Sequence, residues 1–593
     1  MEDSLKKPIK GGEFVVRKST PQELFTPEDQ TEEQKMIAQM CRDFIKNEIQ
    51  PNLDRIDKQE EGLMVSLLEK AGALGLLGLS VPESLGGLGT DFTTNLLATE
   101  SLGAGYSFSV AYGAHTGIGT LPCLYYGSEE LRQKYVPKLA SGEWKGAYCL
   151  TEPGSGSDAN SGKTKATLTA DGKHYNITGQ KMWITNGGFA NVFTVFAKID
   201  GDDNLTAFIV DAQSDGISLN PEEKKMGIKG SSTRQVFFND VKVPIENMLA
   251  GRGEGFKIAL NILNIGRIKL AAGVLGGCKE AMKDAIKYAN ERQQFGRPIS
   301  KYGAIRSKIG EMTIKTFAVE SATYRVGKNI EDTIASQIKD GIAPQRAYLK
   351  GIEEFAAECA LLKVAGSEAL DFVVDEAVQI YGGMGYSAES SVERAYRDSR
   401  INRIFEGTNE INRMLSVEII LKRALKGEID LMGPAMAVAN ELMSIPDMEE
   451  IPDTYLAKET SYVINFKKAL LMVTGTAIQK RMETLSKEQE ILMAVSDIAN
   501  ACYLCESSLL RAQKMQEGPQ KELAGKIVQV MFYDAASTIE KASKDVINNV
   551  AEEDELKMMH MGIRRFCKVE PTNTIKLRNE IAVTAIEKGG FTF

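Results

Sequence analysis

The spacing of apolar residues predicts helices throughout the first part of the chain. Thr31 and Gln34 form a capping box, and the apolar positions that follow recur every three or four residues. Pro51 is expected to end this helix because it has no N–H to donate. A later helical pattern reaches Gly142. Residues 1–150 are therefore predicted to form an N-terminal helical domain.

The period changes between residues 151 and 250. Short runs of β-branched and aromatic residues are separated there by Gly, Asn and Asp, which is typical of strands and turns. The runs are "KHYNITGQKMWITN", "VFTVFAKID", "TAFIVDA" and "RQVFFNDVKVP". We expect a compact antiparallel β-domain inserted between helical parts.

Helical periodicity returns after the β-domain. Residues 251–430 are predicted to form a helical bundle, and residues 431–455, which mix Gly, Pro and acids with an apolar stretch, are predicted to form a linker. Residues 456–593 read as further long amphipathic helices. The predicted fold class is mostly α, with a central β-domain and an additional C-terminal helical domain.

Composition narrows the class of protein. The chain has 593 residues, of which 43% are hydrophobic and 25% charged, and its net charge of −9 argues against a nucleic-acid partner. The N-terminus has no apolar segment, so we expect no secretory signal and a cytoplasmic location, or the mitochondrial matrix in a eukaryote. Residues 101–128 carry no charge and are long enough to span a bilayer. Their Gly, Ser, Thr and Tyr content favours a buried helical region over a membrane span.

Cysteine and histidine restrict the possible chemistry. The eight cysteines show no repeating framework, and the CxxC of Cys502 and Cys505 lies in a helical pattern, which favours core packing over a redox or metal site. The chain has only three histidines, His115, His174 and His560, far apart in sequence. A histidine metal centre or a Ser-His-Asp triad would require them to converge, so we predict no metal site. A carboxylate is the leading candidate for acid–base chemistry.

Two motifs could bind a cofactor. In "YCLTEPGSGSDANS", residues 148–161, glycines free the backbone and Thr151 and Ser157 supply hydroxyls, so the turn could bind a pyrophosphate or flavin edge. A plain connector is the alternative. In "KMWITNGG", Trp183 and Thr185 alternate on a strand and would share one face, which suits a flat heteroaromatic ring. A core tryptophan is the alternative there.

A third motif, "RIFEGTNEINRM", holds an unusual carboxylate. Glu406 lies between Phe405 and Gly407. Burial beside an apolar ring would raise its pKa above the usual value for glutamate by removing water from the charged form. Gly407 would allow close approach of backbone and ligand. The motif therefore contains a carboxylate, the type of side chain that acid–base chemistry would use in a chain with so few histidines.

Taken together, the motifs resemble the acyl-CoA dehydrogenase family. The resemblance covers roughly residues 30–425 and, with the additional helical tail, is greatest to the very-long-chain branch. It is carried by five stretches in the family's order: "YCLTEPGSGSD", "KMWITNGG", "ERQQFGRPI", "QIYGGMGY" and "RIFEGTNEI".

The resemblance implies FAD as the cofactor. Some of the matching positions would contact FAD from the same subunit, and those around Arg292 and Gln379 would reach the FAD of a neighbouring subunit in a homodimer. The implied FAD contacts are Tyr148, Leu150, Thr151, Gly156, Ser157, Trp183, Ile184, Thr185, Arg292, Phe295, Gln379, Ile380, Gly382, Gly383, Thr408, Asn409 and Glu410.

The resemblance also implies a reaction, the removal of a proton from Cα and a hydride from Cβ of an acyl-CoA in fatty acid β-oxidation. Glu406 would be the base, because the position used for the base in isovaleryl-type members, just before Arg267, is Gly266 here. Substrate contacts are expected from Ser157, Asn264, Arg267 and Gly407, although Arg267 could equally serve as an internal ion-pair partner.

Substrate length and partners are the finer expectations. Gly113, Gly117 and Gly119 would leave a long acyl channel, which favours long-chain substrates. Electron-transferring flavoprotein is the expected acceptor. The alternatives are an acyl-CoA oxidase and a non-catalytic assembly protein on the same fold. Residues 431–443 could lie on a membrane, but they carry no Lys or Arg, so we favour a packing role.

Overall fold

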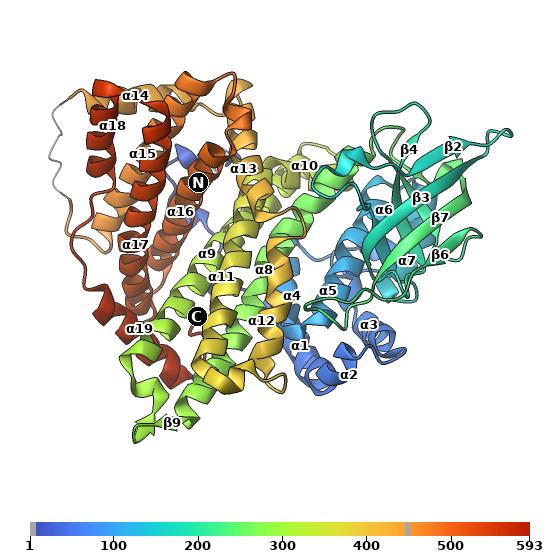
Figure 1. The fold of residues 1–593 in the computed structure, drawn as a ribbon, viewed down its shortest axis with the longest axis horizontal. Helices are drawn as coiled ribbons and strands as arrows, with labels where there is room; N and C mark the ends of the chain where they lie inside the picture. The colour runs from blue at the N-terminus through green and yellow to red at the C-terminus, as the bar shows by residue number, and fades with distance from the viewer. Residues whose placement is uncertain (1–7, 445–450) are drawn as a thin grey trace.

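The computed structural model describes residues 8–444 and 451–593. Long helices occupy the middle of the molecule, with the β-domain on one side and the C-terminal helices on the other (Figure 1). Residues 445–450 of the predicted linker lie outside the described residues.

The N-terminal helical region begins as predicted. The Thr31 side chain accepts a hydrogen bond from the Gln34 N–H at the start of α1 (Glu32–Phe44). The helix continues through the π-helical turn η4 (Ile45–Ile49), and Pro51 lies in the following 3₁₀ turn. The remaining helical segments are α2 (Leu53–Asp57), α3 (Leu63–Ala73), α4 (Phe92–Leu102), η8 (Gly103–Gly105), α5 (Ser107–Gly113), the π-helical η9 (Ala114–Gly119), α6 (Leu121–Tyr126) and α7 (Glu129–Ser141).

The uncharged stretch at residues 101–128 is divided among the end of α4 and the four short segments η8, α5, η9 and α6, and it is mostly buried. Among the described residues, one helix is long and apolar enough to cross a bilayer, namely α8 (Gly255–Glu291). Of its most apolar stretch, 67% is buried in the protein, where α8 packs against α4, α9 and α11. This burial is typical of a core helix.

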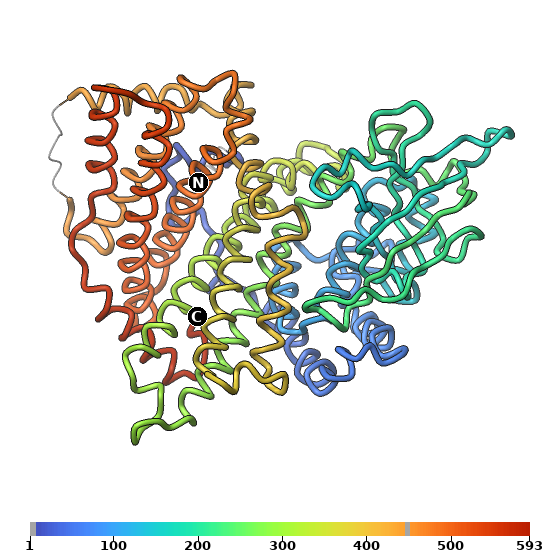
Figure 2. The backbone as a smooth tube through the Cα atoms, in the orientation of Figure 1, coloured from blue at the N-terminus to red at the C-terminus, as the bar shows by residue number. Residues whose placement is uncertain are grey.

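The segment before α1 differs from the predicted domain division. Its 3₁₀ turns η1 (Glu13–Val15) and η2 (Pro21–Glu23) pack against the C-terminal helices, and Figure 2 shows this blue segment among orange ones. The Phe14 ring meets Tyr503 edge-on at 4.7 Å, and Lys467 Nζ donates to the Arg17 carbonyl over 2.8 Å. The apolar residues of this segment find their buried partners there rather than in the N-terminal helices.

The β-domain contains all four predicted strand runs, as β3, β4, β5 and β7. The sheet order is β6-β7-β3-β2-β4-β5-β8, with β1 also paired to β4. The sheet is mixed rather than wholly antiparallel, because β4 pairs in parallel with both β1 and β2. The strands are β1 (Gly146–Cys149), β2 (Lys165–Leu168), β3 (His174–Thr185), β4 (Val192–Ile199), β5 (Thr206–Asp211), β6 (Ile217–Leu219), β7 (Thr233–Pro244) and β8 (Met248–Leu249).

The central bundle contains α8 and α9 (Gly303–Lys339), which are joined by the small hairpin of β9 (Gln293–Gln294) and β10 (Arg297–Pro298). It also contains α10 (Pro344–Glu354), α11 (Ala356–Tyr381), α12 (Ser391–Ser399) and α13 (Asn409–Leu425). Glycines bring α8 against the end of α4. A Cβ at Gly103 would lie 1.9 Å from the Gly273 carbonyl oxygen, and one at Gly276 would lie 2.1 Å from the Glu100 carbonyl oxygen.

The C-terminal region is helical as predicted, and it also includes part of the predicted linker as α14 (Met432–Leu442). Glu441 of α14 pairs with Lys468 and Arg565 at 2.7 and 2.8 Å, so one face of α14 packs against neighbouring helices. The other helices are α15 (Ala457–Arg481), α16 (Gln489–Lys514), α17 (Pro519–Val550), α18 (Glu553–Phe566) and α19 (Thr574–Lys588). Cys502 and Cys505 are buried free thiols in α16, which confirms their packing role.

Candidate active site

Glu406 lies in a strained turn between the 3₁₀ turn η14 (Arg400–Arg403) and α13. Its φ is 58° and that of Gly407 is 83°, so two consecutive residues adopt the left-handed conformation. For a non-glycine residue this costs on the order of 1–3 kcal/mol and is concentrated at functional sites. Thr408 then caps α13, accepting from the Ile411 N–H over 3.3 Å.

Three side chains hold the carbonyl groups of this turn. Arg267 Nε donates to the Glu406 carbonyl oxygen over 3.1 Å. The Gly407 carbonyl oxygen accepts from Lys363 Nζ at 2.7 Å and from Asn412 Nδ2 at 2.8 Å. Fixing the carbonyls from several directions stabilises the left-handed conformation that propensity alone would disfavour.

Glu406 is half-buried, and its carboxylate is incompletely paired. Its Oε2 atom is buried without a hydrogen-bond partner among the described residues. Burial raises the pKa of Glu406 to about 7, and the nearby charges of Arg267 and Lys363 only partly oppose this effect. A Cβ at Gly266 would lie 2.6 Å from Oε2, so the carboxylate occupies the space beside that glycine.

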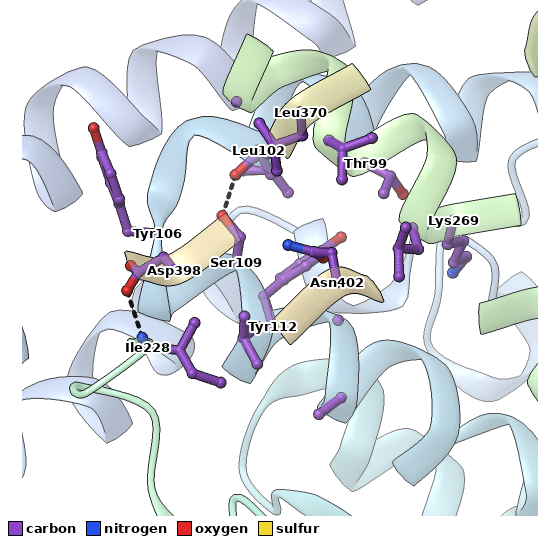
Figure 3. A pocket seen from close by; sticks show the side chains of 18 of the residues that line it. Thr99, Leu102, Tyr106, Ser109, Tyr112, Ile228, Lys269, Leu370, Asp398 and Asn402 are labelled. Carbon is purple, nitrogen blue, oxygen red and sulfur yellow. Dashed lines mark hydrogen bonds between the residues drawn. The ribbon is translucent and has the colours of Figure 1, made fainter. Parts of the chain in front are cut away.

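Glu406 lines a cavity of about 240 Å³ that follows one face of α8. Gly266, Lys269, Gly273, Gly277 and Glu280 all line it, at the spacing of a single helical face. In Figure 3, Tyr106 and Asp398 lie on one side of the pocket and Lys269 on the opposite side. Because Gly266 lies one turn from Lys269, Glu406 is at the Lys269 end.

Glycines predicted to open this cavity do so at two of three positions. A Cβ at Gly113 or Gly117 would meet no atom within 4 Å, and both residues line the cavity. Gly119 is different, because its Cβ would lie 2.8 Å from the backbone of Gly146 in β1. The prediction that Gly119 opens the cavity is therefore wrong. Gly119 instead allows η9 to pack closely against β1.

Other predicted residues gather near Glu406. Thr185 lines the same cavity. Asn264 accepts from Arg267 Nη1 over 2.7 Å, so Arg267 is held by a neighbour on α8. The Tyr148 hydroxyl is buried without a hydrogen-bond partner within the described chain, and desolvation followed by the Glu406 charge raises its pKa. The Glu406 carboxylate, the Tyr148 hydroxyl and the cavity thus lie in one region of the described chain.

The turn after β1 and the end of β3 leave room for a flat ligand. Gly156 and Ser157 are exposed, and a Cβ at Gly154 or Gly156 would meet nothing within 4 Å. Trp183 has a positive φ at a β-bulge and is 52% exposed, while Ile184 beside it is buried. An open backbone turn near a half-exposed indole fits the heteroaromatic cofactor inferred from the sequence.

A second group of predicted cofactor residues lies at the far end of the bundle. Arg292 follows the end of α8, about 39 Å along the helix from Gly266. Phe295, in the β9–β10 hairpin, is 93% exposed. Tyr381 of α11 stacks on Tyr288 of α8 at 4.1 Å. The same end therefore also contains the predicted exposed positions Gln379, Gly382 and Gly383.

Several predicted contacts have side chains that are already engaged. Ile184 and Ile380 are buried in the hydrophobic core. The Asn409 amide is paired with Lys363, Ser367 and Glu368. Leu150 is also buried, and Glu410 is exposed on the first turn of α13. Among the buried residues, the Asn409 amide is engaged by protein partners and the two isoleucines by core packing.

Sequence reasoning missed two residues that shape the turn, Lys363 and Asn412. Asn412 lies within the same motif, four residues after Thr408, where a side chain in the first helical turn reaches back to preceding carbonyls. Lys363 is a lone cation in the apolar run "CALLKVAG" and is fully buried. A buried cation in such a run indicates a specific partner.

The histidine near this site, His115, has a structural role. His115 is fully buried, with Nε2 2.9 Å from the Leu139 carbonyl oxygen and Nδ1 accepting from the Gly146 N–H over 3.0 Å. Burial lowers the pKa of His115 to about 4, so the ring stays neutral near pH 7. Throughout residues 8–444 and 451–593, no three His, Cys, Asp or Glu side chains are grouped as metal ligands.

Comparison with known proteins identifies the family. Acyl-CoA dehydrogenase N-terminal, middle and C-terminal domains match residues 31–143, 147–241 and 253–421. A further acyl-CoA dehydrogenase C-terminal domain matches residues 465–565. The class defined by the fold and these matches is the acyl-CoA dehydrogenases.

Comparison with individual proteins gives the same family. A probable acyl-CoA dehydrogenase of Bacillus subtilis is 46% identical over 98% of both chains. The human very long-chain specific acyl-CoA dehydrogenase is 39% identical over 70% of this chain and 61% of its own. A crystal structure of a Bacillus anthracis acyl-CoA dehydrogenase complexed with FAD has 45% identity and a TM-score of 0.96, covering 99% of this chain and 100% of that one. The chain belongs to the acyl-CoA dehydrogenase family.

Proposed function

We propose that this protein is an FAD-dependent acyl-CoA dehydrogenase that converts long-chain acyl-CoA thioesters to trans-2-enoyl-CoA, with Glu406 as the catalytic base. The observation that carries the proposal is the Glu406 carboxylate, which lines the cavity beside Gly266 and has one buried oxygen without a partner in the described chain. A carboxylate with a pKa of about 7 has the basicity that proton abstraction near neutral pH requires.

FAD, which the close Bacillus anthracis relative contains, fits the open turn and the half-exposed Trp183 described above. Thr151, Ser157 and Thr185 offer hydroxyls to the flavin and its phosphates, and Trp183 offers an aromatic face. When bound, FAD supplies the hydride acceptor. Arg292, Phe295 and the Gln379–Gly383 segment are too distant to join this site in the same chain, which supports a homodimer with FAD sites shared between subunits.

Glu406 has two roles toward the substrate. Its carboxylate takes the proton from Cα, which places negative charge on the thioester oxygen. Its backbone N–H donates no hydrogen bond to any described residue and is free to stabilise that oxygen. Arg267 and Asn412 hold the Glu406 carbonyl, which stabilises the left-handed turn that contains this N–H. Asn264 and Gly407 would flank the substrate.

Channel length supports a long acyl chain. The lining residues Gly266 and Glu280 are about 21 Å apart along α8. An extended hydrocarbon advances about 1.25 Å per carbon, given C–C bonds of about 1.5 Å, so a chain of about 16 carbons matches this length. Gly113, Gly273 and Gly277 leave the channel open between its ends.

The electron acceptor, the metabolic pathway and the cellular location are part of the same proposal. Electron-transferring flavoprotein would reoxidise the reduced enzyme, and fatty acid β-oxidation in the cytoplasm would supply the substrate. The bacterial origin of close relatives supports that location. The exposed methionines of α14, Met432 and Met436, are compatible with peripheral membrane contact, whereas the Glu441 ion pairs favour packing.

Anaerobic mixing of the purified yellow protein with palmitoyl-CoA tests the proposal. We expect bleaching of the flavin and reoxidation by electron-transferring flavoprotein. Glu406→Gln should keep its flavin but lose at least a thousandfold in the rate of bleaching. Bleaching of this variant at the normal rate would contradict the assignment of the base. No bleaching of the wild type would favour an assembly protein, and rapid reoxidation by air would favour an oxidase.

A further inference from the structure

A buried chain of charged side chains connects the C-terminal helices to the wall of the cavity. It consists of Arg511 on α16, Glu320 on α9, Lys279 on α8 and Glu100 on α4. Arg511 and Glu320 are 0% and 1% exposed. We call these four residues the charge chain. None of them lies in the site described above.

Arg511 anchors the charge chain in the C-terminal region. Its Nη1 donates to Glu320 Oε2 over 2.6 Å, and its Nη2 donates to Glu28 over 2.6 Å. The guanidinium also lies over the Phe317 ring, 4.4 Å from its centre. A bidentate donor with an aromatic face beneath it has little freedom to move, so Glu320 is held in place from the C-terminal side.

Lys279 and Glu100 form the cavity end of the charge chain. Lys279 Nζ pairs with both Glu320 and Glu100, and the Tyr324 hydroxyl also donates to Glu100. On either side of Lys279, Gly277 and Glu280 line the cavity.

Glu100, on the facing helix α4, also lies between residues that line the cavity. Its neighbour Thr99 lines the cavity, as does Gly103 one turn on. The pair between Lys279 and Glu100 therefore joins the two helices that form this wall. The joined positions lie 11 to 14 residues along α8 from Gly266, in the half of the cavity distant from Glu406.

Arg511 balances the buried negative charge beside this wall of the cavity. With Arg511 present, Glu320 is shared between two cations and Lys279 can also pair with Glu100. Without Arg511, Lys279 alone faces two buried carboxylates. Buried charges without sufficient partners attract water or force side chains apart, and the groups affected would be those that join α4 to α8.

We infer that Arg511, through Glu320 and Lys279, is a positioning residue for acyl-chain length: it keeps the far half of the acyl channel in shape. This gives the C-terminal helical region a role in substrate selection. The inference rests on the proposed function, because the cavity is taken as the acyl channel. Butyryl-CoA would occupy only the Glu406 end, whereas palmitoyl-CoA would need the whole length.

Arg511→Met in the full-length flavoprotein tests the inference. We expect the ratio of kcat/KM for palmitoyl-CoA to that for butyryl-CoA to fall at least fivefold, with the butyryl-CoA value changing less than twofold. Glu320→Gln added to Arg511→Met should restore the ratio, because it leaves Lys279 paired one-to-one with Glu100. Arg511→Lys should retain most of the ratio. Rates are expressed per bound flavin, so loss of folded protein does not change the ratio.

Arg325→Met is the matched control. Arg325 lies on the same helix as Glu320 and forms another buried ion pair with α16, to Glu506 at 2.9 Å. Its loss should lower the melting temperature but leave the ratio unchanged. An unchanged ratio in Arg511→Met, an equal fall in Arg325→Met or no restoration by Glu320→Gln would overturn the inference. A wild type without preference for palmitoyl-CoA would contradict the proposed chain length instead.

Discussion

The carboxylate of Glu406 lies against the α-carbon of Gly266. A Cβ at Gly266 would be 2.6 Å from Glu406 Oε2 and 2.8 Å from its Cδ, closer than non-bonded atoms approach. The two positions therefore depend on each other: a carboxylate from the turn before α13 can enter the cavity only where α8 has no side chain.

Gly266→Ala should displace the carboxylate of Glu406, the proposed base. The added methyl forces the Glu406 side chain to rotate, and misplacement of a catalytic group by about 1 Å can cost on the order of 10²-fold in rate. We expect flavin reduction by palmitoyl-CoA to slow at least tenfold in stopped-flow measurements. Gly273→Ala is the control, because its Cβ would lie 3.7 Å from its nearest neighbour, Thr99, in the same cavity. Equal rates for the two variants would contradict the proposed contact.

Glu406 should make the folded protein less stable at alkaline pH. Burial raises its pKa from 4.5 to about 7, so the stability contributed by its bound proton is fully present below about pH 4.5 and is lost as the pH rises through 7. A shift of this size corresponds to about 3 kcal/mol. Glu406→Gln should therefore raise the melting temperature at pH 8 but have little effect at pH 4.5.

Glu410→Gln provides the comparison for this stability measurement. Glu410 is exposed on the first turn of α13, where a hydrogen bond from its own backbone N–H lowers its pKa. Its replacement should give no stabilisation at pH 8. A melting temperature of Glu406→Gln equal to that of the wild type at pH 8 would mean that the carboxylate is well solvated.

The sequence was sufficient where local chemistry decides structure. The Thr31 capping box, the four strand runs and the helix end at Gly142 depend on neighbouring residues, and all are present. The sequence relates Glu406 to Gly266 only through the family resemblance, because the periodicity of apolar residues does not connect these two positions. Propensity alone would not place Glu406 in a left-handed turn, because the conformation depends on Arg267 and Lys363, which come from other helices.

Contacts between distant segments account for the differences. Phe14 packs against Tyr503, a partner nearly 500 residues away that local pattern cannot identify. The parallel pairing of β1 and β2 with β4 likewise depends on the path of the chain between strands. Gly119 resembles Gly113 and Gly117 in sequence but faces β1 instead of the cavity. In each case the surrounding sequence does not identify the distant segment that the residue or strand contacts.

Filling the channel at Gly113 should shorten the preferred substrate. A Cβ there would meet no atom within 4 Å, so a larger side chain would enter the cavity without displacing the backbone. For Gly113→Leu we expect kcat/KM for palmitoyl-CoA to fall at least tenfold, while butyryl-CoA turnover changes little. An equal fall for both substrates would show that Gly113 acts through the backbone or near the thioester.

Lys269 places a cation in a channel proposed to hold hydrocarbon. It lines the cavity, and burial lowers its pKa to about 8, with no carboxylate in the described chain close enough to oppose this effect. Near pH 7 the side chain is mostly charged, and a passing acyl chain must remove water from it at a cost in free energy. Lys269→Met keeps the length of the side chain without the charge, so KM for palmitoyl-CoA should fall severalfold at pH 7 with kcat little changed.

The same substitution makes a prediction about pH. The wild-type KM for palmitoyl-CoA should decrease as the pH rises through 8 and Lys269 loses its proton, whereas Lys269→Met should not show this decrease. Lys257→Met, at an exposed position on the same helix, should leave both KM and its pH dependence unchanged. A rise in KM for acyl-CoAs of every length in Lys269→Met would mean instead that the ammonium contacts an oxygen of the substrate, because a hydrocarbon offers it no acceptor.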